Sequence, residues 1–120
     1  MTVCLDTGVF LQMTLAVSTE ILLEYQEIIT RLSGAERWHD AVALLELLEQ
    51  IHGNIRRVNP QFRFNIISVD PDDNKFCDCA IAAEADFVVT EDNHFDALKT
   101  AGYRPKAIQP GEFIRQYLMI

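Results

Sequence analysis

The stretch that decides the fold is DPDDNKFCDCAIAAEADFVVTEDNHF, which runs from Asp70 to Phe95. Between residues 76 and 83 its apolar side chains recur at spacings of three and four, directly after Asp72 and Asp73. This spacing predicts an amphipathic helix with an acidic start. The apolar run Phe87 to Val89 follows, and such a run is typical of a strand that is covered on both faces.

Two apolar strands in the chain each lead to an aspartate. Val3 to Leu5 runs directly into Asp6, and the strand at residues 87 to 89 is soon followed by Asp92. Ligands collect at the carboxyl ends of parallel strands, so both aspartates are expected at the functional edge of the sheet. Neighbouring carboxylates repel one another unless a cation compensates them. Mg²⁺ and Mn²⁺, which prefer oxygen ligands, are the expected cations.

Composition places limits on the function. The 120 residues, of which 49% are apolar and 23% charged, predict a single globular domain over residues 1–120. The net charge of −8 argues against a broad basic surface for nucleic acid, although a bound metal can reverse the local sign. Three cysteines without a metal-type array indicate a reducing cytoplasm, with Cys77 and Cys79 in the core. No apolar run is long enough to span a membrane.

Strand and helix patterns alternate along the chain, which predicts a three-layer α/β domain around a parallel sheet. Ser18 or Thr19 is expected to cap the first helix. Its buried stripe is predicted to run from Ile21 to Leu32, and that of the next helix from Trp38 to Ile51. The expected elements are a strand at 2–6, helices at about 19–32 and 35–51, an extended segment at 64–69, the central helix and strand, a short helix at 95–101, a strand at 106–108 and a C-terminal helix with Pro110 in its first turn.

The ordered acids of this chain resemble those of the PIN domain, specifically its VapC-like bacterial toxin branch. They are Asp6 in LDTGVF, Glu24 in STEILLEYQEI, and Asp73 and Asp92 in the central stretch, with PGEF near the C-terminus. The resemblance covers nearly the whole chain and implies a PIN-like three-layer α/β/α fold. It also implies a Mg²⁺- or Mn²⁺-dependent ribonuclease, whose four acids bind the metal and act in catalysis, and a cognate antitoxin protein as partner.

The chain departs from this family near its N-terminus. Gly8 stands where the family usually has Asn, and the family's first helix is absent. Only residues 7 to 14 separate Asp6 from a candidate strand at 15–17, which is too short for a helical crossover between parallel neighbours. A sheet face left without its helix would expose Val, Ile and Leu side chains. We therefore predict self-association and a weakened nuclease activity.

Each acid also has a structural interpretation. Asp72 and Asp73 are in the usual position of helix caps, and Asp92 is in that of a turn or cap residue. Glu24 lies on a polar helical stripe that is typical of a solvated face. Asp78 is a candidate for a supporting role around the site. Among the three histidines, His94 alone lies close enough in sequence to the acids to deserve a test.

The favoured mechanism is metal-assisted hydrolysis of an RNA phosphodiester bond. A covalent route is disfavoured because no Ser or Cys has a matching base. An acidic groove of this kind predicts that an inhibitory partner inserts Arg or Lys. Two alternatives are a catalytically silent PIN-like binding module and a receiver-type phosphoryl-transfer domain. The receiver type is disfavoured because Lys106 precedes the last apolar pair rather than following it.

Overall fold

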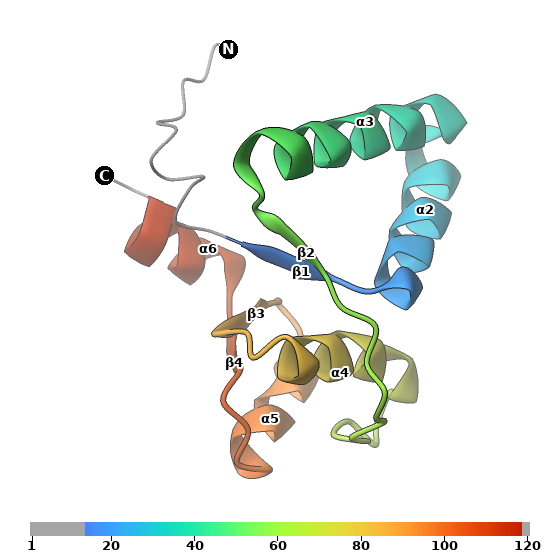
Figure 1. The fold of residues 1–120 in the computed structure, drawn as a ribbon. Coiled ribbons are helices and arrows are strands. Elements are labelled where there is room, and N and C mark those ends of the chain that lie inside the picture. Colours follow the sequence, from blue (N-terminus) through green and yellow to red (C-terminus); the bar gives the residue numbers. More distant parts are fainter. Residues whose placement is uncertain (1–13, 119–120) are drawn as a thin grey trace. The chain divides into compact units, whose positions relative to one another are not determined.

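The computed structural model describes residues 14–118, which form two compact units, one ending at Arg57 and the other beginning at Val58 (Figure 1). Each unit combines helices with a two-stranded parallel sheet, so the predicted α/β class with parallel strand pairing is confirmed. The predicted strand at residues 2–6, with Asp6 and Gly8, lies outside the described residues. No helix among the described residues is long and apolar enough to cross a membrane.

Along the chain of the first unit, two helices separate two strands that pair with each other. Its elements are β1 (Leu15–Val17), α2 (Thr19–Ser33), α3 (Ala35–His52) and β2 (Ile55–Arg57). The strands run parallel, with Leu15 opposite Ile55 and Val17 opposite Arg57. Residues 15–17 are therefore a strand, as the sequence suggested. Strand β2 was not predicted, because its sequence, Ile-Arg-Arg, has no apolar run.

Local signals in the sequence set the helix boundaries of the first unit. Ser18, rather than Thr19, caps α2, since its hydroxyl accepts the Ile21 N–H at 3.2 Å. Gly34, at φ 91°, separates α2 from α3. Gly53 ends α3 in the left-handed conformation, at φ 61°, and its N–H donates to the Glu49 carbonyl. Figure 1 shows the sharp corner between the two helices.

The predicted buried stripes of these helices are only partly correct. Ile21 is buried, with 3% of its surface exposed, whereas Leu32 is 73% exposed. In α3, Leu44 and Ile51 are 57% and 62% exposed. Helical spacing predicted one apolar face for each helix, but within residues 14–118 too few side chains pack against either face to cover all of it. Apolar surface therefore remains exposed on α2 and α3.

The second unit contains the decisive stretch. Its elements are a 3₁₀ turn η1 (Pro71–Asp73), α4 (Asn74–Ala82), β3 (Phe87–Val89), a 3₁₀ turn η2 (Asn93–Asp96), α5 (Ala97–Thr100), β4 (Lys106–Ile108), α6 (Pro110–Phe113) and a final π-type turn η3 (Ile114–Leu118). Strands β3 and β4 run parallel, with Val88 opposite Ala107. The predicted helices and strands of this region are confirmed, but the acidic start of the central helix is a separate 3₁₀ turn.

The core of the second unit brings α4 against the segments that follow β3. Ile67, Cys77, Phe95 and Leu98 form its buried cluster. The Phe76 ring packs edge-on against Phe95, with ring centroids 6.3 Å apart. The predicted core positions of Cys77 and Cys79 are confirmed, since both are fully buried.

The segment between Val58 and Asp70, which was expected to be extended at 64–69, forms no strand and pairs with neither sheet. Side chains of α4 hold this segment instead. Asp78, which is buried, accepts the Phe64 N–H at 3.0 Å. Asn74 both accepts the Ile67 N–H at 2.8 Å and donates to the Ile67 carbonyl at 2.9 Å. These bonds replace the strand partners that the segment lacks.

Candidate metal centre

Three side chains of the second unit converge at one point. Asp73, Asp92 and His94 each offer one ligand atom, and these atoms all lie within 4.8 Å of one another. Asp73 stands at the end of η1, directly before α4, whereas Asp92 and His94 begin η2 after β3. Two segments nearly twenty residues apart in sequence therefore build the cluster.

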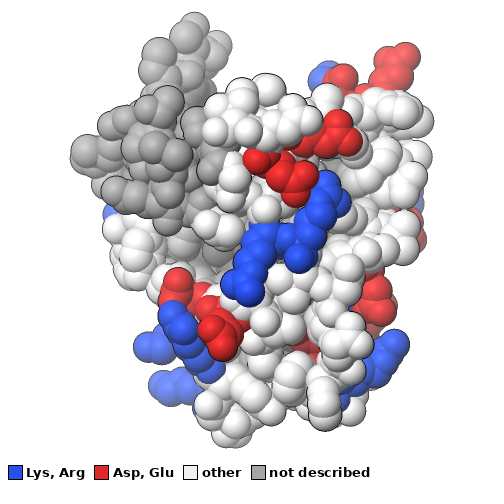
Figure 2. Space-filling view, viewed as in Figure 1, with Lys and Arg blue, Asp and Glu red and all other residues white. Residues whose placement is uncertain are grey.

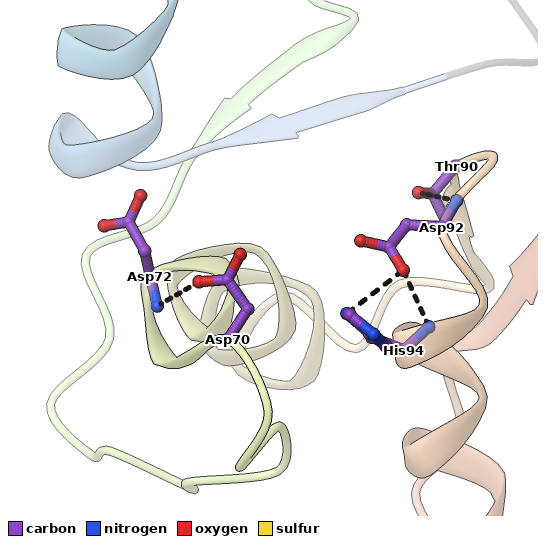
Figure 3. Close-up of polar contacts among 5 residues, drawn as sticks. All are labelled: Asp70, Asp72, Thr90, Asp92 and His94. Atoms are coloured by element: carbon purple, nitrogen blue, oxygen red, sulfur yellow. Dashed lines mark hydrogen bonds and ion pairs between the residues drawn. The ribbon is translucent and has the colours of Figure 1, made fainter.

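The turn that carries Asp73 is capped by a different aspartate. Asp70 Oδ1 accepts the Asp72 N–H at 3.3 Å (Figure 3). The Asp70 carbonyl accepts the Asp73 N–H at 3.1 Å. Asp72 forms an ion pair with Lys75 at 3.4 Å. Asp70, rather than Asp72, therefore caps this turn with its side chain. Asp73 stands at the N-cap position of α4, as one interpretation predicted, but its side chain makes no capping hydrogen bond there.

Asn74 fixes the backbone next to Asp73. Its side-chain amide holds both polar backbone groups of Ile67, a residue with only 3% of its surface exposed. This pair of bonds ties the first turn of α4 to the core of the unit. The position of the Asp73 carboxylate consequently depends on Asn74.

The loop after β3 positions Asp92 and His94. The Thr90 N–H donates to the Ile108 carbonyl at 2.9 Å, which ties the end of β3 to β4. Thr90 Oγ1 accepts the Asp92 N–H at 3.0 Å, and Asp92 Oδ1 accepts the His94 N–H at 2.8 Å (Figure 3). Thr90 thus orients Asp92 through its backbone rather than through its carboxylate. Asp92 does cap η2, as one interpretation predicted, and it belongs to the cluster as well.

The imidazole of His94 turns back toward the same carboxylate. Its Nδ1 lies 3.3 Å from Asp92 Oδ1. This nitrogen is enclosed by the protein, yet among the described residues it has no partner in hydrogen-bonding geometry. The side chains of His94 and Asp92 are still 38% and 39% exposed, so the cluster is open to solvent on one side.

The spacing of the ligand atoms fits a small divalent cation. With bonds of 2.0–2.1 Å, adjacent ligands of an octahedral Mg²⁺ ion are about 2.9 Å apart and opposite ligands about 4.2 Å apart. The observed 3.3 Å contact and the 4.8 Å limit need only a small closure to match these values. Two carboxylates and an enclosed imidazole nitrogen, which lies 3.3 Å from Asp92 Oδ1 and has no hydrogen-bond partner among the described residues, form a suitable donor set. The remaining positions would go to water or substrate.

A small pocket of about 80 Å³ adjoins the cluster. Acidic and amide side chains contribute much of its wall, together with the end of β4. Its lining residues are Thr90, Glu91, Asp92, Asn93, Asp96, Ala107, Ile108 and Gln109. The pocket therefore favours cations and hydrogen-bond donors over free anions.

Of the four predicted acids, the structure brings Asp73 and Asp92 together. Asp6 lies outside the described residues, and Glu24 belongs to α2 in the first unit, so the roles of these two remain predictions. Asp78 has a structural contact with Phe64. His94, which the sequence singled out for a test because it lies two residues after Asp92, is the third member of the cluster.

Comparison with known protein families gives a match. The chain matches the family model of the PIN domain over residues 2–94, a range that contains all four predicted acids and His94. Comparison with curated proteins and with solved structures gives no match.

Proposed function

This chain belongs to the PIN domain family, whose members are generally nucleases, and on that premise we propose that it is a metal-dependent endoribonuclease. The observation that carries the proposal is the convergence of Asp73, Asp92 and His94 within 4.8 Å in the second unit. Membership of this family excludes the receiver-type alternative. The resemblance to toxin components adds Asp6 and Glu24 as the remaining acids of the site.

In this proposal Asp73 and Asp92 hold Mg²⁺ or Mn²⁺, and Glu24 orients the attacking water. When bound, the metal lowers the pKa of water and neutralises charge that develops on the phosphate. The two cysteines of the second unit are not rival nucleophiles. Burial, followed by the nearby charges of Asp78 and Asp73, raises the pKa of Cys77 to about 12, and burial also raises the pKa of Cys79. Both thiols therefore stay protonated near neutral pH.

The proposed RNA substrate must be recognised mainly at the metal site. Figure 2 shows Lys and Arg side chains interspersed with Asp and Glu side chains. Several arginines are already paired with acids: Arg57 with Glu49 at 3.0 Å, and Arg104 with Asp86 at 2.9 Å. Few cations are then available for phosphates, so RNA affinity should depend only weakly on salt concentration.

Two partners complete the proposal. The first is an inhibitory antitoxin that inserts Arg or Lys beside the acids, since a cationic side chain complements an acidic pocket.

The second partner is another copy of this chain. Exposed leucines on α2 and α3, such as Leu32 and Leu44, support self-association. Light scattering coupled to size exclusion should then give more than the monomer mass of 13.7 kDa at high micromolar concentration. A monomer under those conditions would contradict self-association.

Cleavage of single-stranded RNA tests the proposed activity. Wild type should cleave with added Mg²⁺ or Mn²⁺ and not in EDTA, and Asp73→Asn should lose most of this activity. Asp72→Asn is the matched control, because it removes the same charge from the neighbouring, exposed position. Equal activity in the two variants would reject the assigned site. Metal binding without any cleavage would instead favour the silent PIN-like module.

A further inference from the structure

We propose that His94 supplies a nitrogen ligand, through Nδ1, to the metal held by Asp73 and Asp92, and that the site consequently selects Mn²⁺ over Mg²⁺. The inference rests on the proposed function, because it refines the same site. It assigns a role to a side chain outside the four acids.

The backbone around the His94 imidazole is held in place. Phe95, the next residue, is 4% exposed and packs in the core against Phe76. The His94 N–H is fixed on Asp92 Oδ1 at 2.8 Å. The backbone on both sides of the imidazole is thus anchored, which limits the positions that Nδ1 can reach. A ligand held in this way loses little conformational freedom when a metal binds.

The Nδ1 atom of His94 lacks a hydrogen bond among the described residues. It is enclosed by the protein, and within residues 14–118 it has no partner in hydrogen-bonding geometry. An enclosed polar atom without a hydrogen-bond partner costs free energy, so it calls for an explanation such as a bound ion. The simplest alternative is that Nδ1–H donates to Asp92. However, Asp92 Oδ1 already accepts the backbone N–H, and the 3.3 Å approach of Nδ1 does not form a proper hydrogen bond.

The ligand atoms at the site differ in which metal they prefer. Carboxylate oxygens suit both Mg²⁺ and Mn²⁺, whereas an imidazole nitrogen favours transition metals. A site with two carboxylates and one imidazole should therefore bind Mn²⁺ more tightly than a site of carboxylates alone. Replacing His94 with glutamine should weaken Mn²⁺ binding on the order of tenfold or more, because one ligand is lost. Mg²⁺ binding should change much less.

Pulsed electron paramagnetic resonance of bound Mn²⁺ tests this directly and needs no turnover. Wild type should show ¹⁴N modulation from a directly bound imidazole, and labelling only histidine with ¹⁵N should replace that signal. His94→Gln should lose the signal, whereas His39→Gln, at an exposed position on α3, should keep it.

The outcomes separate the inference from the proposed function. Mn²⁺ that binds in an Asp73-dependent manner without nitrogen modulation would overturn the role of His94 and leave the metal site in place. Failure of Mn²⁺ to bind at all would overturn the metal site and the inference with it. So would binding to Asp73→Asn and Asp92→Asn that is as tight as binding to wild type. The measurement on wild type is decisive even if His94→Gln folds poorly.

Discussion

Replacing Asn74 with alanine should destabilise the protein by about 2–6 kcal/mol. The Asn74 amide accepts the Ile67 N–H at 2.8 Å and donates to the Ile67 carbonyl at 2.9 Å. Ile67 is 3% exposed, so water can reach its backbone only with difficulty. Leaving a buried donor or acceptor unsatisfied costs about 1–3 kcal/mol, and the variant leaves one of each.

Urea unfolding, followed by circular dichroism, measures this loss. Asn93→Ala is the matched control, because Asn93 is exposed on η2 and should change stability by less than about 0.5 kcal/mol. Asn74→Asp keeps the shape but cannot donate to the Ile67 carbonyl unless the new carboxyl is protonated. Its deficit relative to wild type should therefore shrink as the pH falls toward 4. An Asn74→Ala deficit below about 0.5 kcal/mol would refute the claim that this amide holds the segment.

Two further predictions concern the cap of α2 and the buried thiols. Ser18→Ala should cost about 1 kcal/mol in urea unfolding through the lost cap, while Ser33→Ala at the other end of α2 should cost nothing; equal losses would contradict the cap. In a Cys4→Ser variant, Cys77 and Cys79 should react with a thiol reagent only after unfolding, and fast reaction of the native protein would contradict their burial. The fold raises the pKa of Cys77 to about 12, whereas the unfolded thiol has a pKa of about 8.5. The stability that the protonated Cys77 thiol contributes is therefore complete below about pH 8.5 and is lost as the pH rises from there toward about 12. Cys77→Ala should accordingly flatten the alkaline fall in stability.

The sequence predicted those elements of the fold that have strong local signals. Ser18, Gly34 and Gly53 mark the ends of α2 and α3, and the apolar run Phe87–Val89 marks β3. Strand β2 could not be predicted in this way, because a three-residue edge strand with two arginines gains its pairing from β1 and not from its own composition. The exposed Leu32 was missed for a similar reason. Spacing gives the direction of a helix face but not the presence of a partner.

The candidate site was predictable in its acids but less so in its detail. Asp92 follows from a strand end, Asp73 follows from the acidic start of the central helix, and the family resemblance selects both; the structure brings them together. Sequence alone could not assign capping to Asp70 instead of Asp73, since three aspartates occupy four positions there. His94 joins the cluster only because the Thr90 and Asp92 bonds curl the loop back on itself. Such a turn depends on tertiary anchoring to β4.

Thermal unfolding with and without metal tests the central claim most directly. At a Mg²⁺ or Mn²⁺ concentration a hundredfold above the dissociation constant, wild type should gain about 2.7 kcal/mol of stability. Asp73→Asn and Asp92→Asn should lose most of that gain, and Asp72→Asn, which removes a carboxylate outside the cluster, should keep it. The same stabilisation in all four proteins would contradict a metal centre at Asp73 and Asp92.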